Sequence, residues 1–126
     1  MTVIVAISAC DPASALAWTH AYSVDWDLWG KLSLFDEVIP QLYYSSFAAF
    51  QAEFEKTLSS VSPAARSSMV AIGLRVDGSG PPTPWSDVDD MLSACKKNNL
   101  GAALWYAHGI LEIYPDEIKR QWTPSW

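Results

Sequence analysis

Polar side chains stand in pairs near the ends of apolar runs in this chain, at a spacing that brings both members to one side of a β-strand. Gln41 and Tyr43 are two residues apart, and so are Arg75 and Asp77. Successive side chains of a strand point to opposite faces, so residues two apart share a face. An amide, a phenol, a guanidinium and a carboxylate can together hydrogen-bond a polar ligand, and the carboxylate can also transfer a proton. These four residues are therefore the first candidates for a binding site.

Each pair has a functional and a structural interpretation, and the sequence leaves both open. The amide of Gln41 lies in an otherwise apolar segment and needs hydrogen-bond partners, which sugar hydroxyls beside Tyr43 or the neighbouring backbone would supply. Arg75 and Asp77 either line a pocket mouth or neutralise each other at the edge of a sheet. In the functional interpretation Gln41, Tyr43 and Arg75 bind the ligand. Asp77 is then the candidate catalytic acid/base, with Arg75 as its partner.

A third group of candidates follows the last apolar run. Trp105 and Tyr106 are consecutive, so one ring faces the pocket and the other packs under the helices; Trp105 is the candidate for stacking on a sugar ring. His108 is a further candidate for contacting the ligand, and an ordinary loop histidine is the alternative, because nothing in the sequence fixes its partner.

A pair of catalytic carboxylates is not evident. Most glycosidases place two carboxylates on either side of the bond that they cleave. The predicted strand ends offer only Asp11, Asp77 and Glu112, in no convincing pair. We therefore expect weak or absent hydrolysis from a chain that binds carbohydrate.

Four apolar runs rich in β-branched residues supply the strands that would position these side chains. They are Val3–Ser8, Glu37–Tyr44, Met69–Val76 and Ala102–Ala107. Their starts at 3, 37, 69 and 102 are separated by 34, 32 and 33 residues. A period in the low thirties is the length of one strand, one helix and two loops, so the architecture repeats although the sequence does not.

The intervals between the runs are predicted helices. They are Asp25–Lys31, Phe47–Ser60, Ser86–Asn98 and a last helix that begins at Pro115. Ser23 or Asp25 is the expected cap of the first helix, and Pro63 is expected to end the region of the second. Ser86 and Asp89 have a capping-box-like spacing, with aspartate in place of the usual glutamate or glutamine.

Strands this apolar indicate a parallel sheet that is covered on both faces. We expect one α/β domain over residues 1–126, with four consecutive β/α units. An open doubly wound sheet and half of a (β/α)8 barrel both fit, since a full barrel needs about 250 residues. In either architecture the functional edge is the carboxyl end of the strands.

Composition excludes several classes of function. Eight Lys and Arg against 14 Asp and Glu give a net charge of −6 with no basic run, which disfavours nucleic-acid binding. With two histidines and the cysteines Cys10 and Cys95, no zinc motif can be written, and we expect no metal or other cofactor. No stretch is long enough to span a membrane, and two reduced thiols favour a cytoplasmic protein.

Several short motifs resemble bacterial glycoside-hydrolase-like proteins described as family-10-like, or as the YngK type. The matching segments are Asp25-Trp26-Asp27-Leu28-Trp29, Phe35-Asp36-Glu37, Pro40-Gln41-Leu42-Tyr43-Tyr44, Val70–Leu74 and Gly101–Tyr106. The resemblance covers about residues 3 to 113 and implies the C-terminal half of a TIM barrel that binds or hydrolyses glycosidic bonds. By position, it also implies that Gln41 and Tyr43 contact the substrate.

The departure from that family is the missing first half of the barrel. An open half-barrel exposes its inner face and two strand edges, which two copies, the chain's own loops or a longer parent chain would cover. We therefore expect a carbohydrate-binding half-barrel, either as a homodimer or lacking an N-terminal half-barrel. The alternatives are a non-enzymatic homodimeric assembly module and a small open α/β domain with an unrelated ligand.

Overall fold

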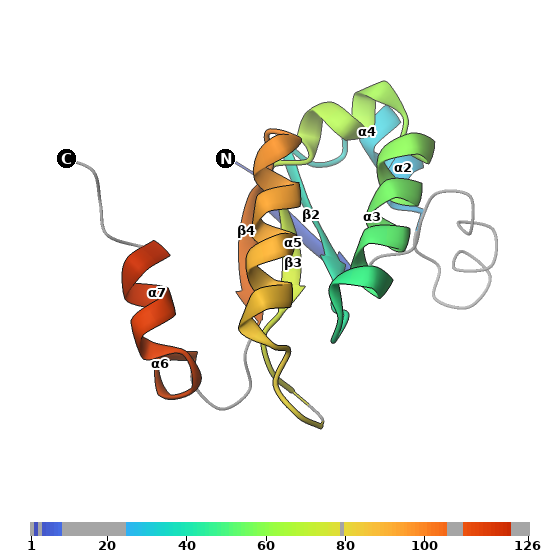
Figure 1. The fold of residues 1–126 in the computed structure, drawn as a ribbon. Helices are drawn as coiled ribbons and strands as arrows, with labels where there is room; N and C mark the ends of the chain where they lie inside the picture. The colour runs from blue at the N-terminus through green and yellow to red at the C-terminus, as the bar shows by residue number, and fades with distance from the viewer. Residues whose placement is uncertain (1, 3, 9–24, 79, 106–109, 122–126) are drawn as a thin grey trace.

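The structure is a computed structural model that describes residues 2, 4–8, 25–78, 80–105 and 110–121. Its four strands form one parallel sheet in chain order (Figure 1): β1 (Ile4–Ser8), β2 (Glu37–Leu42), β3 (Ala71–Arg75) and β4 (Gly101–Trp105). Each strand lies within a predicted apolar run, except that β4 begins one residue early. The predicted α/β class and parallel sheet are confirmed.

Six helices are described. They are α2 (Trp26–Lys31), α3 (Phe47–Ser60), α4 (Pro63–Ser68), α5 (Trp85–Lys97), α6 (Ile110–Ile113) and α7 (Pro115–Gln121). In Figure 1, α3 and α5 lie in front of the sheet, and α2 and α4 pack together near the end where the strands begin. In the part of the chain that the structure describes, no helix is long and apolar enough to cross a membrane.

Most predicted helix boundaries are correct because local caps determine them. The Asp25 side chain, one of the two expected caps, accepts a hydrogen bond from the Leu28 N–H at 3.0 Å and so caps α2. The bounds of α3 match the prediction. Pro115 is the first residue of α7, where its fixed φ suits a helix and its missing N–H costs nothing.

Two predictions near prolines are wrong. Pro63 does not close the region of α3 but opens α4, with the Ser62 hydroxyl accepting from the Ala65 N–H at 3.3 Å. Helix α5 begins at Trp85, and its cap is Pro84 without any side-chain cap, so Ser86 and Asp89 form no capping box. In both places proline stands at or just before the first turn, where it is tolerated.

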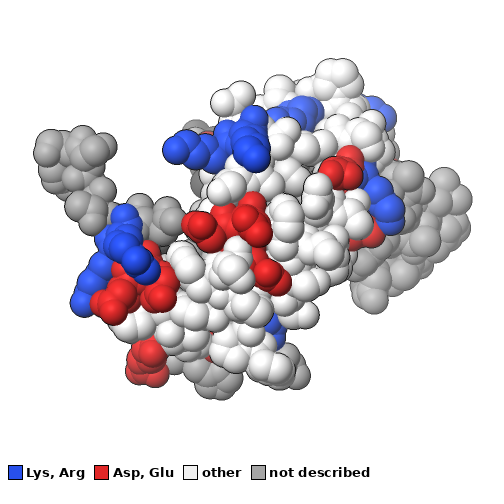
Figure 2. Space-filling model, in the orientation of Figure 1, with Lys and Arg blue, Asp and Glu red and all other residues white. Residues whose placement is uncertain are grey.

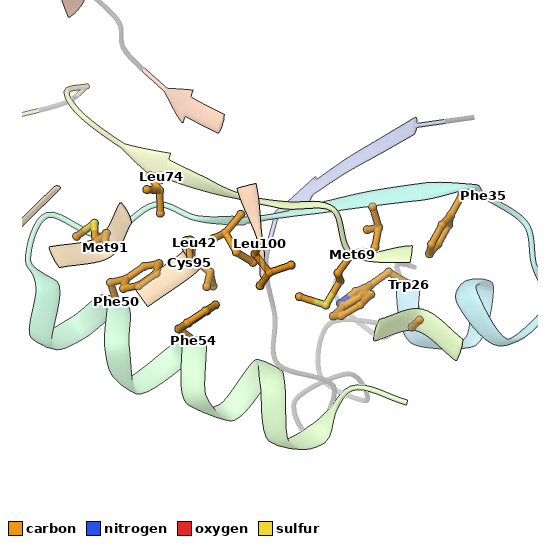
Figure 3. Close-up of a cluster of buried hydrophobic side chains, with 13 residues drawn as sticks. Trp26, Phe35, Leu42, Phe50, Phe54, Met69, Leu74, Met91, Cys95 and Leu100 are labelled. Carbon is orange, nitrogen blue, oxygen red and sulfur yellow. The ribbon is translucent and has the colours of Figure 1, made fainter. Parts of the chain in front are cut away.

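The hydrophobic core lies between the sheet and the helices in front of it. Figure 3 shows Phe50 and Phe54 of α3 pointing toward the sheet, where Leu42 of β2 and Leu74 of β3 meet them. These side chains are buried, and the even-numbered residues of β2 and β3 all face this side. The core therefore fixes the odd-numbered residues to the opposite face.

That opposite face corrects the expectation that both faces of the sheet are covered. In β4, Gly101, Ala103 and Trp105 are exposed, whereas Ala102 and Leu104 pack against the core. Glycine and alanine made the run apolar throughout, but residues this small are compatible with an exposed surface, so composition concealed the alternation. The sheet is buried on its helix side and open at the far side of β4.

Charged side chains are dispersed over the helix side of the molecule. Figure 2 shows acidic and basic residues there in several small, separate groups, with no continuous basic patch on that face. Many of these residues pair along their own helix. Lys31 and Asp27 on α2 and Lys56 and Glu53 on α3 are examples, with N–O distances of 2.9 and 2.7 Å.

Candidate functional site

Two aromatic rings meet at the carboxyl end of the sheet. Tyr43 directly follows β2, and Trp105 is the last residue of β4; their ring centroids are 5.9 Å apart and their planes differ by 24°. Strand β3 lies between β2 and β4, so the two side chains approach each other across it. Tyr43 is 37% exposed and Trp105 is 50% exposed. We call Tyr43 and Trp105 the aromatic pair.

The floor beneath the aromatic pair is Gly73 of β3. It stands opposite Gln41 in β2 and opposite Ala103 in β4. A β-carbon at position 73 would lie 3.2 Å from Tyr43 Cε1 and 3.3 Å from Gln41 Cγ. The absence of a side chain on β3 therefore leaves room for the Tyr43 ring.

Arg75 at the end of β3 holds the loop that follows it. Its Nη1 donates to the Thr83 hydroxyl at 3.0 Å, and its Nη2 donates to the Pro81 carbonyl oxygen at 3.1 Å. A β-carbon on Gly78 in this loop would lie 3.6 Å from Arg75 Nε and 3.9 Å from Trp105 Nε1. The loop thus turns back beside the indole of the aromatic pair.

Two further hydrogen bonds hold the same loop. The Thr83 N–H donates to the Val76 carbonyl oxygen at 2.7 Å, which closes the loop at its base. The Tyr114 hydroxyl, just before α7, donates to the Thr83 carbonyl oxygen at 2.6 Å, and its ring packs against Trp85. Desolvation by burial, followed by the negative charge of Glu117, raises the pKa of Tyr114, so its hydroxyl stays a hydrogen-bond donor at neutral pH.

Four of the predicted site residues come together at this edge. Gln41, Tyr43, Arg75 and Trp105 lie at the carboxyl ends of three neighbouring strands, and Gln41 and Tyr43 share a face as expected. Burial raises the pKa of Tyr43, so its hydroxyl is protonated and neutral at physiological pH. The arrangement offers two partly exposed aromatic rings near an amide and a guanidinium.

The other candidates are placed differently. Asp77 is buried, at 3% exposed, whereas Arg75 two residues earlier is partly exposed, so the two do not present one accessible surface. Glu112 lies exposed on α6. His108 and Asp11 lie outside the described residues.

The structure assigns local roles to three residues that the sequence did not mark as site residues. Gly73 makes room for the Tyr43 ring, Thr83 receives Arg75, and Tyr114 fastens the loop from α7's side. A lone glycine inside an apolar strand is a known sign of close approach by another group, and it was the one available signal. Thr83 and Tyr114 depend on contacts between distant segments, which no local pattern reveals.

Other features of the described residues do not add a second chemical centre. No three His, Cys, Asp or Glu side chains among them are grouped to hold a metal ion. Burial raises the pKa of the Cys95 thiol to about 11, which keeps it protonated and unreactive. Two hollows of about 410 and 400 Å³ lie against α5 on the helix side, away from the aromatic pair; residues of both α3 and α5 line the larger one.

Comparisons of this chain with protein-family models, with curated proteins and with solved structures found no match.

Proposed function

We propose that this protein binds carbohydrate at the aromatic pair, Tyr43 and Trp105. The observation that carries the proposal is the exposure of both rings at the carboxyl ends of parallel strands, the edge at which α/β folds place their ligands. Large aromatic side chains are costly to leave in water, and the apolar C–H face of a sugar ring is a partner that covers them.

Polar groups around the aromatic pair suit the hydroxyl groups of the same ligand. Gln41 stands one pleat below Tyr43 on the same face, and its amide both donates and accepts hydrogen bonds. Arg75 ends β3, which lies between the strands that precede or carry the two rings, and its guanidinium donates hydrogen bonds but accepts none. We also propose that His108, in the segment after β4, contacts the ligand.

The finer architecture that we propose is half of a (β/α)8 barrel. Strands that follow one another in chain order, all parallel, with α3 and α5 on one face, are the arrangement of consecutive barrel units. The small residues Ala71, Gly73 and Ala103 on the other face would then line the inside of the barrel.

Binding, rather than turnover, is the part of the proposal that the geometry supports best. Asp77 stays the candidate acid/base for any hydrolysis, but its carboxylate is buried. A buried carboxylate reaches a substrate only after the loop that carries it moves. Any turnover of an oligosaccharide by the wild type would therefore be lost in Asp77→Asn while binding is retained.

Calorimetric titration with a panel of gluco-, xylo- and chito-oligosaccharides tests the proposal. We expect one class to bind, and Trp105→Ala or Tyr43→Ala to weaken its affinity about tenfold or more, the size of one lost aromatic contact. The matched control is Leu32→Ala, which removes a comparably exposed apolar side chain from the loop after α2. Equal affinity in wild type and both aromatic variants, or no binding to any sugar, would refute a carbohydrate site here.

The second candidate function is a homodimeric assembly module. It is favoured by a different observation: β4 is an edge of the described sheet, and the outward face of that strand is exposed along its whole length. An unpaired edge and an open face of this kind are sites where another chain pairs.

A further inference from the structure

We infer that Gly73 is the positioning residue of the aromatic pair: its missing side chain lets Tyr43 reach across β3 to Trp105. The inference rests on the proposed function for the identity of the ligand, but the contact between the two rings is testable without any ligand. Glycine has no functional group, yet at this position it determines the shape of the site.

Strand geometry makes this role necessary. Neighbouring strands of a sheet lie about 4.8 Å apart, so β2 and β4 are separated by about twice that distance. The two rings nevertheless have centroids 5.9 Å apart, which requires both side chains to lean over the strand between them. Position 73 is the last residue of β3 before Arg75 that faces this side.

The space at Gly73 is filled by the groups that form the site. A β-carbon there would lie 3.1 Å from Gln41 Cα, 3.3 Å from Gln41 Cγ and 3.2 Å from Tyr43 Cε1. Contacts this short force the neighbours to move by a few tenths of an ångström or more. The backbone of Gln41 is held by its pairing with β1 and β3, whereas Tyr43 follows β2 and its ring lies outside that pairing. The ring is therefore the group that yields.

The side chain of Arg75, one pleat further along, reaches into the following loop. Its guanidinium is drawn toward Thr83 and Pro81 in the following loop. Glycine at 73 and a tethered arginine at 75 thus leave the surface over β3 to the aromatic pair. A larger residue at 73 would split that surface into two separate rings.

The test is the variant Gly73→Ala with Gly101→Ala as its matched control. Gly101 lies on the same face of the sheet, and a β-carbon there is similarly crowded, at 3.3 Å from the Val70 carbonyl oxygen and 3.4 Å from Ala71 Cβ. Proton NMR reports nuclear Overhauser contacts between the Tyr43 and Trp105 rings. We expect these contacts in the wild type and Gly101→Ala and weaker contacts in Gly73→Ala, together with a loss of affinity of up to about tenfold for the sugar that the wild type binds.

Ring contacts that persist unchanged in Gly73→Ala would overturn the inference. If Gly73→Ala does not fold, the double variant Gly73→Ala/Tyr43→Ala decides: folding of the double variant supports crowding against the ring, and failure to fold shows that the Gln41 backbone is the obstacle and overturns the inference. Weaker ring contacts in Gly73→Ala, in a protein that binds no sugar, support the role of Gly73 and refute the proposed function alone.

Discussion

At the residue scale, two fully buried threonine hydroxyls have opposite surroundings. Among the described residues, Thr57 Oγ1 on α3 has no hydrogen-bond partner, whereas Thr83 Oγ1 accepts from Arg75 Nη1 at 3.0 Å. A buried hydroxyl without a partner carries the cost of lost hydration, and one with a partner recovers that cost. The same substitution should therefore change stability in opposite directions at the two sites.

We predict that Thr57→Val raises the free energy of unfolding by about 1 kcal/mol, because valine keeps the shape and removes the unsatisfied hydroxyl. Thr83→Val should lower it by about 1 to 2 kcal/mol, because Arg75 loses an acceptor that is buried. Urea denaturation followed by circular dichroism measures both values. A Thr57→Val protein that is less stable than the wild type would show that its hydroxyl has a partner after all.

The sequence predicted which types of side chain stand at the candidate site better than it predicted which residues contact them. Gln41, Tyr43 and Trp105 are recognisable because large polar or aromatic side chains at the ends of apolar runs are unusual. Gly73 is not, because its role depends on what leans over it from β2 and β4. The burial of Asp77 was equally out of reach, since the residue follows β3 and no local pattern fixes its exposure.

At the element scale, one carboxylate joins α2 to α4. Asp27 on α2 accepts from the Ser62 N–H at the start of α4 at 2.8 Å and pairs with Lys31 at 2.9 Å. Asp27 is 8% exposed, and its burial alone would raise its pKa. The hydrogen bonds from Lys31 and Ser62 outweigh burial and hold the pKa of Asp27 below the ordinary 3.8. The carboxylate form is thus the one that stabilises the fold.

This lowered pKa predicts how stability changes with pH. A group whose pKa is lower in the folded state contributes stability that is full above its unfolded pKa and is lost as the pH falls through the folded value. Asp27→Asn should therefore lower the free energy of unfolding by about 1 kcal/mol at pH 7, and the difference should shrink below pH 3.8.

Urea denaturation of wild type and Asp27→Asn at pH 7, 5 and 3 measures that difference. Glu53→Gln is the control: it removes a carboxylate that pairs with Lys56 on the surface of α3, where the expected change is below about 0.5 kcal/mol at any pH. A difference for Asp27→Asn that is constant from pH 7 to pH 3 would contradict the role of its charge.

Helix boundaries were predicted well where an apolar periodicity defines the helix and less well next to prolines. The apolar stripe of α3, with Phe50 and Phe54 buried, matched the prediction at both ends. Pro63 is compatible with stopping one helix or starting another, and only packing chooses. Ala65 of α4 is fully buried, and a β-carbon at Gly30 of α2 would lie 2.7 Å from Ala65 Cβ, so only glycine fits at position 30. Such contacts between helices are invisible in a local window.

At the scale of the whole molecule, helices cover one face of the described sheet, and the opposite face is exposed along β4. Its order places β1 and β4 at the two edges, and all strands run in the same direction. A twofold axis parallel to the strands would therefore place β4 of each copy beside β1 of the other copy, in parallel pairing. Two aromatic pairs would then face one another at the same end of an eight-stranded barrel.

This arrangement predicts a dimer that a single charged substitution on the outward face of β4 prevents. Ala103 lies exposed at the centre of β4's outward face, so Ala103→Lys would bury an ammonium group in the barrel interior or at the paired edge. Sedimentation equilibrium at micromolar concentration should give twice the chain mass for the wild type and the single mass for Ala103→Lys. Ala52→Lys, the same substitution on the exposed surface of α3, should remain a dimer. A monomeric wild type would refute the assembly module and leave carbohydrate binding, which needs only one aromatic pair, to be judged on its own titration.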